Sequence, residues 1–333
     1  MTMSGTLESL SVLVTSYNKA EYIKSFSKWA RALSSRNAEL CIVDDFSSDG
    51  SDVQLADLAA NLKNTKFVAL KSNVGSAGAR NACISLATRK FVFFLDIDDE
   101  PSLEVLESCL KTLAELNSDI LVANLLVHPS GEALEMPLVT SRPVKIQLET
   151  IKTSLSTIMG YSRYIYSLSF IKTRALRFFP TRSENGGQYF ILDDSFWLLQ
   201  IGATSGNLVV TKSDSIIYHY YPPLGDSNSW NRYISQIINL PTLVKQFIEK
   251  HTLNPNLVPS KLITQTITWM FLTLRPLNVS QLLKSNIFSL IPWKFVVVHV
   301  KPSKILILFF NFLSLIGYSF KNSIRIRSRV NRP

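Results

Sequence analysis

The densest cluster of chemically active side chains in the sequence is a run of four acids. Directly after an apolar stretch the chain reads Asp96-Ile-Asp98-Asp99-Glu100. Mutual repulsion makes such a run costly unless a cation is bound. If the apolar stretch is a strand, alternation places Asp96 and Asp98 on one side and turns Asp99 away. Two of these carboxylates can then share one Mg²⁺ or Mn²⁺ and leave room for substrate phosphates. The alternative interpretation is a solvated acidic loop.

Two other apolar stretches also end in polar side chains. The first runs into Thr15, Ser16 and Tyr17, whose hydroxyls can hold a nucleobase or a phosphate where the chain turns into a helix. The second ends in Asp44 and Asp45, and two adjacent carboxylates after a buried strand exceed what helix capping requires. One of them can accept a hydrogen bond from a base N–H while the other orders the turn. Capping alone is the alternative explanation for Ser16.

A glycine-containing helix start follows at residues 73–81. Gly75 and Gly78 lie three residues apart, but the first glycine of GxGxxG is missing and the segment does not follow the first apolar stretch. A dinucleotide-binding fingerprint is therefore not supported. Gly75 and Arg80 are nonetheless assigned to a nucleotide site, because a helix start with an arginine one turn in can face a diphosphate. An arginine on a solvated helix face is the alternative.

The elements that must position these residues alternate along the chain. Short apolar runs of the kind that buried parallel strands show occur at residues 10–15, 39–43, 66–70, 91–95 and 119–127. Helical apolar patterns separate them. This order predicts an α/β fold with a mostly parallel sheet and helices on both faces, in which ligands bind at the carboxyl ends of the strands. Beyond residue 130 the pattern is irregular, with short strands predicted at 207–211 and 215–221.

Length and composition exclude several classes of protein. With 333 residues, 46% of them hydrophobic, the chain can bury the core of one large domain or two ordinary ones, so it is not intrinsically disordered. The cysteines Cys41, Cys83 and Cys109 lie far apart without CxxC or Cys/His ligand spacing, which argues against disulfides or zinc and favours a reducing compartment. No basic stretch precedes the first apolar run, so we expect no secretory signal and a cytoplasmic chain.

Positive charge is concentrated in the C-terminal quarter. The formal net charge is +10, yet residues 250–333 contain twelve Lys or Arg and no acid, which leaves 23 basic against 25 acidic residues over 1–249. Such an asymmetry indicates a nucleic acid or a membrane surface as a partner. The tail has no exposed aromatic residues interleaved with its basic ones in a recognisable nucleic-acid-binding module, so we expect no nucleic acid.

The basic tail contains an apolar segment at residues 305–320. Its sixteen positions fall short of the ~18 to 20 residues that span a bilayer. Polar residues recur along it at helical spacing and form one narrow stripe, which is typical of a helix lying in a membrane interface. Flanking lysines and arginines suit anionic lipid, so residues 301–333 are predicted to bind an anionic membrane surface. The alternative is a helix at an interface with another domain or a second subunit.

Four motifs at the predicted strand ends form a recognisable series. They are Thr15-Ser-Tyr-Asn-Lys19, Asp44-Asp-Phe-Ser-Ser-Asp-Gly-Ser51, Asn73-Val-Gly with Ala79-Arg-Asn81, and Phe94-Leu-Asp-Ile-Asp-Asp99. In this order and spacing they resemble glycosyltransferase family 2, whose members have the GT-A fold. The resemblance implies that Thr15 and Tyr17 flank the uracil of a UDP-sugar and that Asp45 accepts from the base. It further implies that Asp98 contacts the ribose or the metal, and that Asp98 or Asp99 ligates a divalent ion bridging the diphosphate. The other residues assigned to the nucleotide site are Ser16, Asp44, Gly75, Arg80 and Asp96.

Two motifs in the second half resemble parts of the same family. Family members carry a Glu-Asp pair ahead of a helix, and here Asp193 and Asp194 resemble it, with Asp194 as the implied general base. Such a carboxylate takes the proton of the acceptor hydroxyl as that oxygen attacks C1, and one base with in-line attack implies inversion. His219 is implied as a third metal ligand or a diphosphate contact. The alternatives are helix capping for the acidic pair and a packed aromatic strand for His219.

The sequence therefore predicts an inverting, metal-dependent glycosyltransferase of the hexosyltransferase type. Mn²⁺ or Mg²⁺ is the expected cofactor, and a nucleotide sugar, expected to be UDP-linked, is the donor. The acceptor is a hydroxyl of a cell-envelope polysaccharide or a lipid-linked glycan at the inner face of the cell membrane. We expect residues 1–130 to bind the donor, 131–250 to bind the acceptor and supply the base, and 251–333 to form a helical, basic appendage. The rival hypothesis is a catalytically silent glycan-binding or scaffold protein with the same fold.

Overall fold

The computed structural model describes much of the first two-thirds of the chain. The described residues are 6–127, 132–134, 144–145, 164–178, 181–182, 188–189, 197, 200–201 and 209–220. The chain divides into two compact units, Met1–Pro223 and Leu224–Pro333, and the described residues all belong to the first. The predicted part boundaries at residues 130 and 250 stay predictions. Within the described residues, the helices are all too short or too polar to cross a membrane.

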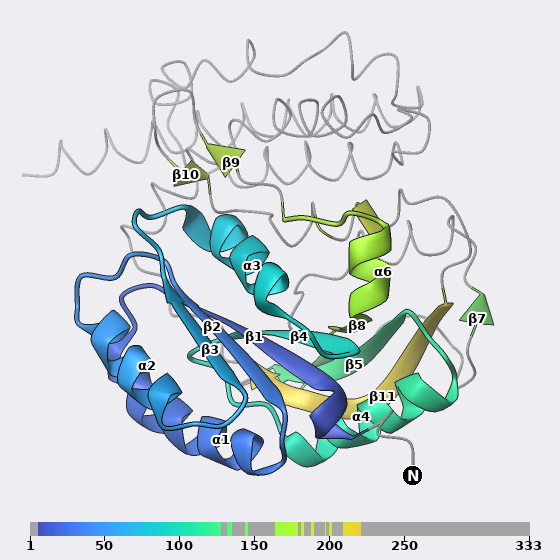
Figure 1. Ribbon diagram of the computed structural model, residues 1–333. Coiled ribbons are helices and arrows are strands. Elements are labelled where there is room, and N and C mark those ends of the chain that lie inside the picture. The colour runs from blue at the N-terminus through green and yellow to red at the C-terminus, as the bar shows by residue number, and fades with distance from the viewer. Residues whose placement is uncertain are drawn as a thin grey trace, which may run out of the picture. The chain divides into compact units, whose positions relative to one another are not determined.

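A mixed sheet forms the centre of the first unit (Figure 1). Among the described residues its strands are β1 (Leu10–Ser16), β2 (Glu39–Asp44), β3 (Thr65–Ala69), β4 (Phe91–Asp96), β5 (Ile120–Val127), β6 (Glu132–Leu134), β7 (Val144–Lys145), β8 (Tyr164–Ser167) and β11 (Val209–Tyr220). They follow the order β3-β2-β1-β4-β8-β5-β11-β7, with β6 paired to β5. The first four strands in this order are mutually parallel, as predicted. A separate antiparallel hairpin joins β9 (Thr181–Arg182) and β10 (Gln188–Tyr189).

The second half of the sheet departs from the prediction in two ways. Strand β8 inserts antiparallel between β4 and β5, whereas the sequence pattern indicated a simple parallel continuation. The prediction of two short strands at 207–211 and 215–221 is wrong, because one strand, β11, runs through both stretches parallel to β5. Its pairing register shifts between Lys212 and Ile216. Such a bulge interrupts the alternation of side chains, so one strand has the sequence pattern of two.

Helices cover both faces of the sheet. They are α1 (Ile23–Ser35), α2 (Ser51–Ala60), α3 (Gly75–Leu86), α4 (Leu103–Glu115) and α6 (Leu168–Thr173), with the short 3₁₀ turns η1 (Leu7–Ser9) and η2 (Ala20–Tyr22). Helices α1, α2 and α4 lie on one face, and α3 and α6 lie on the other (Figure 1). Val12 and Val14 of β1 belong to the core on the first face. Leu13 between them belongs to the core on the second, as strand alternation requires. Because helices cover both faces of the sheet, polar side chains that could bind a ligand are confined to the ends of the strands.

The acidic turn after β4 comprises residues 96–100. Hydrogen bonds fix the two residues that follow it. The Trp29 indole on α1 donates to the Pro101 carbonyl at 2.8 Å. The Ser102 hydroxyl caps α4 by accepting from the Val105 N–H at 3.3 Å, and the Ser102 N–H donates to the Ile217 carbonyl of β11 at 3.2 Å. The path of the chain on leaving the acidic turn is therefore fixed by α1, α4 and β11 together.

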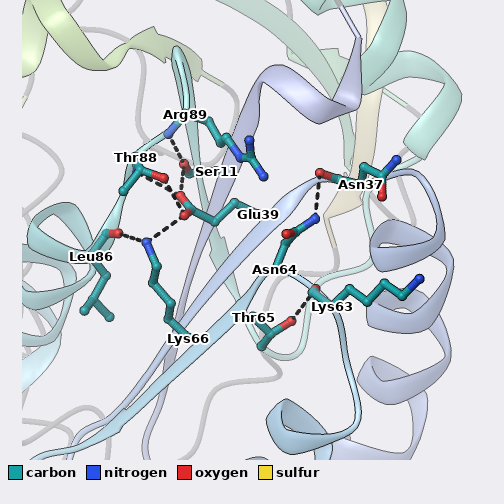
Figure 2. Close-up of polar contacts among 10 residues, drawn as sticks. All are labelled: Ser11, Asn37, Glu39, Lys63, Asn64, Thr65, Lys66, Leu86, Thr88 and Arg89. Carbon is teal, nitrogen blue, oxygen red and sulfur yellow. Dashed lines mark hydrogen bonds and ion pairs between the residues drawn. The ribbon is translucent and has the colours of Figure 1, made fainter.

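A buried carboxylate, that of Glu39, lies at the amino-terminal ends of the strands (Figure 2). Glu39 is 4% exposed and accepts hydrogen bonds from Ser11 on β1, from Lys66 on β3 at 2.7 Å, and from the N–H and hydroxyl of Thr88 at 2.8 and 2.6 Å. Lys66 also donates to the Leu86 carbonyl at the end of α3 at 2.8 Å. Burial raises the pKa of Glu39, but these hydrogen bonds outweigh it and lower the pKa from 4.5 to about 2. The ionised form of Glu39 therefore stabilises the fold.

Replacing Glu39 with glutamine is expected to lower the free energy of unfolding at pH 7 by about 3 kcal/mol, because lowering the pKa from 4.5 to about 2 corresponds to roughly this amount. The folded-state pKa lies below the unfolded one. The contribution is therefore complete above pH 4.5 and is lost as the pH falls toward 2. Urea unfolding should show the wild-type advantage shrinking between pH 6 and pH 3. Glu104→Gln, which removes an exposed ion pair with Arg36, is the control and should change little. A deficit independent of pH would contradict this role of the ionised carboxylate.

Candidate functional site

The carboxyl ends of β1, β2 and β4 meet at the opposite edge of the sheet, as the sequence predicted. In the register of these strands Thr15 lies beside Asp96 and Ser16 lies beside Asp44. The Thr15 hydroxyl donates to Asp96 Oδ1 at 3.4 Å. The start of α3 reaches the same edge, because its backbone N–H groups donate to Asp45. All four motifs from the first half of the chain thus converge at one place.

Arg80 is part of this convergence. Its side chain is buried, with Nη2 lying 3.2 Å from Asp96 Oδ1 and the guanidinium lying over the Phe178 ring at 5.5 Å. The alternative of a solvated helix arginine is therefore wrong. Arg80 supplies a positive charge one turn into α3, beside the carboxylate that follows β4, and its planar donor group is suited to bind phosphate oxygens.

Asp98 and Asp99 have different surroundings. The Asp98 side chain is 35% exposed and forms an ion pair with Lys19, with Nζ and Oδ2 2.6 Å apart. Asp99 is more buried. Burial, together with the negative charges of Asp96 and Asp98, raises the pKa of Asp99 to about 7, and the positive charge of Lys19 opposes this only in part. The turn therefore concentrates more negative charge than its protein partners neutralise, and a bound cation would relieve the repulsion.

A divalent cation fits this turn if the substrate completes its coordination. Within the described residues, no three His, Cys, Asp or Glu side chains lie close enough together to hold a metal ion alone. Mg²⁺ is usually held by one or two carboxylates plus substrate phosphates and water, and the oxygens of Asp98 and Asp99 are ligands that it prefers. The predicted third ligand, His219, lies on β11, but its side chain is outside the described part of the structure.

Asp44 and Asp45 have different hydrogen-bond partners. The Asp44 carboxylate accepts from the N–H and hydroxyl of Ser47 at 2.8 and 2.6 Å, so it orders the turn after β2. Asp45 accepts from the N–H groups of Val74 and Gly75 at 2.7 and 2.8 Å, and Gly75 has φ +79°, a conformation that favours glycine. Burial raises the pKa of Asp45, and Asp44 adds to the shift against these hydrogen bonds. Each oxygen of Asp45 accepts one of these bonds and has a second lone pair.

Two hydrogen bonds join the loops after β1 and β2 beside the site. The side-chain oxygen of Asn18 accepts from the Ser48 N–H at 2.9 Å, and the Asn18 N–H donates to the Ser47 hydroxyl at 2.9 Å. Tyr17 and Phe46 extend from these loops with 50% and 56% of their surface exposed, and Phe46 has φ +65°, which is uncommon for a bulky residue. Phe46 was not among the residues predicted for the site. The one feature of the sequence that marks Phe46 is that it is an aromatic residue inside a turn otherwise built of Ser, Asp and Gly.

Ser16 also has the character of a ligand-binding residue. It is 3% exposed, and its hydroxyl has no hydrogen-bond partner among the residues that the structure describes. Its carbonyl accepts from the Asp45 N–H at 2.8 Å, which links the ends of β1 and β2. Since buried hydroxyl groups are nearly always hydrogen-bonded, this one is available to a bound molecule or water.

Phe178 connects the donor-side helix to the second half of the chain. The Asn81 side chain on α3 bonds both the N–H and the carbonyl of Phe178, each at 2.8 Å. The Phe178 ring stacks on the fully buried Trp197, with centroids 4.3 Å apart, and meets Phe94 of β4 edge-on at 5.1 Å. Trp197 follows the acidic pair by three residues in the sequence, but Asp193 and Asp194 lie outside the described residues. Their assignment stays a prediction.

Comparison with known sequences finds a match to one family. The profile of Glycosyl transferase family 2 matches residues 11–173. The succinoglycan biosynthesis protein ExoO of Rhizobium meliloti is 28% identical over 217 residues, which cover 62% of this chain and 59% of ExoO. Poly(ribitol-phosphate) β-N-acetylglucosaminyltransferase TarS of Staphylococcus aureus is 30% identical over 162 residues, or 48% of this chain and 26% of TarS. The matched region thus spans less than two-thirds of either relative.

Comparison with solved structures agrees. The crystal structure of S. aureus TarS 1–349 superposes with a TM-score of 0.62 over 96% of this chain and 91% of that one, at 19% sequence identity. At such identity the similarity shows the fold. The strand order and the helices on both faces define an α/β domain with a mixed central sheet (Figure 1). Residues 11–173 match glycosyltransferase family 2, and the fold is the GT-A fold.

Proposed function

We propose that the protein is an inverting hexosyltransferase that moves a sugar from a UDP-linked donor to a hydroxyl of a cell-envelope polysaccharide or lipid-linked glycan. The observation that carries the proposal is the convergence of Thr15, Asp45, Arg80 and Asp96 at one sheet edge. Relatives support the substrate class. ExoO is a succinoglycan biosynthesis protein, and TarS 1–349 has been crystallised with UDP and with UDP-GlcNAc.

The donor would bind with its base at the ends of β1 and β2 and its diphosphate toward α3. Tyr17 and Thr15 flank the base, and Asp45 accepts its N–H. Asp98 contacts the ribose or the metal, Asp96 belongs to the same nucleotide site, and Arg80 faces the diphosphate at the start of α3. Asp98 and Asp99 would hold Mn²⁺ or Mg²⁺, which when bound stabilises the negative charge of the leaving diphosphate. His219 would approach the same group from β11.

The acceptor side would supply the base. Asp194 takes the proton of the acceptor hydroxyl, while the contacts of Arg80 hold the diphosphate in line with the attacking oxygen. Because only one carboxylate acts and no glycosyl-enzyme forms, the configuration at C1 inverts. Phe178 supports this geometry, since it contacts both Arg80 and Trp197.

The test is a thermal-shift panel of UDP, GDP, ADP and CMP, each with Mn²⁺ and with EDTA. We expect UDP with Mn²⁺ to raise the melting temperature most. If the nucleotides leave the melting temperature unchanged in every condition, the proposed donor site is wrong. Binding without turnover of any nucleotide sugar would favour the rival hypothesis of a catalytically silent glycan-binding or scaffold protein.

The basic tail is proposed to hold the enzyme at the inner face of the membrane, near its acceptor, from the cytoplasmic side. Deleting residues 302–333 is expected to abolish sedimentation with anionic liposomes, because each Lys or Arg near such a surface contributes about 1 kcal/mol of binding. UDP affinity should be unchanged. Neutral liposomes are the control. Liposome binding that survives the deletion would contradict the membrane role, and a change of oligomeric state would favour a subunit interface. Retention on heparin without liposome binding would indicate a nucleic-acid partner instead.

A further inference from the structure

Lys19 is a cation built into the edge of the site. Its backbone N–H donates to the Ser51 hydroxyl at the start of α2 at 3.1 Å, so the loop that carries it is fixed. From there the side chain reaches across to the end of β4, where Nζ lies 2.6 Å from Asp98 Oδ2. The ammonium also lies over the Tyr22 ring, 4.8 Å from its centroid. The ion pair joins two residues that are 79 positions apart in sequence.

Asp96 and Asp98 in the acidic turn form ion pairs with different cationic side chains. Asp96 has Arg80, which is buried and held from behind by Phe178. Asp98 has Lys19, and both of these side chains are 35% exposed. An arginine held in a fixed plane keeps its partner, whereas a lysine is a compact charge on a flexible stem. Exposed ion pairs are weak enough to be exchanged for a better ligand.

We propose that Lys19 competes with the divalent cation for Asp98. The inference rests on the proposed function, in which Asp98 is a metal ligand. The ammonium holds the carboxylate while no metal is present, and it gives up the carboxylate when the metal arrives, since an ammonium and a metal ion cannot share Oδ2 without strong repulsion. The ammonium already lies over the face of the Tyr22 ring, and this contact can persist when the carboxylate is released.

This competition weakens metal binding with and without nucleotide, because Asp98 is a ligand in both cases. Without nucleotide, a metal ion must displace Lys19 and gains only carboxylate ligands. With nucleotide, the same displacement is needed, but the diphosphate supplies further ligands and the exchange becomes favourable. Lys19 would therefore raise the Kd for the metal by a similar factor in both states and so discourage metal binding to the empty site.

The test measures Mn²⁺ binding to the full chain by electron paramagnetic resonance of the free ion, with and without UDP. Lys19→Met should lower the Kd for Mn²⁺ alone by about 3- to 10-fold, because it removes an exposed pair and a nearby positive charge. With saturating UDP the Kd should be lower for both proteins, and Lys19→Met should lower it by a similar factor, because the metal displaces the same ammonium. By linkage, the coupling between UDP and Mn²⁺ should then be the same in both proteins.

Two variants control for charge and folding. Lys24→Met removes the same charge from an exposed position on α1 and should leave the Kd at the wild-type value. Lys19→Arg keeps the ion pair and should also resemble wild type. Equal Kd values in wild type and Lys19→Met, or an equal effect of Lys24→Met, would overturn the inference while leaving the metal role intact. Mn²⁺ that fails to bind any of these proteins even with UDP would overturn both the inference and the proposed metal site.

Discussion

Replacing Asp194 with asparagine is expected to lower kcat by roughly 10²- to 10⁴-fold and to leave donor affinity nearly unchanged. Asparagine keeps the size and much of the hydrogen bonding of aspartate, but it cannot take the proton of the acceptor hydroxyl. If Asp194 were only a helix cap, asparagine would cap about as well, and both activity and melting temperature would stay near wild type. The measurement is the rate of UDP release from the donor, with water replacing the acceptor if necessary.

The neighbouring carboxylate provides the matched control for this experiment. Asp193→Asn makes the same change one residue earlier and should have the milder effect, because the resemblance to the family assigns the base to the second member of the pair. An inactive Asp193→Asn with a fully active Asp194→Asn would show that Asp193 is the base. Full activity in both variants would show that neither carboxylate acts in the mechanism.

The second large effect is expected at the metal site. Asp98→Asn should lower kcat/KM by roughly 10²- to 10³-fold, because metal stabilisation of a leaving group contributes several kcal/mol and each 1.4 kcal/mol is tenfold in rate. The Mn²⁺-dependent increase in UDP affinity should be lost as well. Calorimetric titration of UDP with Mn²⁺ and with EDTA measures this directly.

Glu100 is the matched control for Asp98. It is an exposed acid two residues further along the same turn. Glu100→Gln therefore removes one negative charge, as Asp98→Asn does, but leaves both proposed metal ligands in place. We expect Glu100→Gln to keep both the metal effect and most of the activity. An Asp98→Asn protein that still binds UDP more tightly with Mn²⁺ would show that this carboxylate is not a ligand.

The first half of the fold was predictable from sequence because its signals are local. The strands from β1 to β4 are each a continuous apolar run, as strands covered on both faces are, and the helices between them keep one apolar stripe. The carboxyl ends of parallel neighbours necessarily meet, which is why the sequence alone is enough to group Thr15, Asp45 and Asp96. The register confirms this grouping.

The features that the sequence did not predict depend on contacts between distant residues. Strand β8 has only four residues, and nothing in the pattern of Tyr164–Ser167 predicts that it separates β4 from β5. The bulge in β11 gave one strand the pattern of two. The ion pair of Lys19 with Asp98 and the contact of Arg80 with Phe178 join residues about 80 to 100 positions apart, and no local spacing predicts such partners.

The most direct test of the proposed function is the stereochemistry of turnover. The protein is incubated with an α-linked UDP-sugar and Mn²⁺, UDP release is followed, and the anomer of the first-formed product is read by proton NMR before mutarotation. We predict that UDP is released and that the product is first the β-anomer, because one carboxylate base directs a single in-line displacement. An α-product would contradict inversion, and no UDP release from any nucleotide sugar would contradict the assignment as an enzyme.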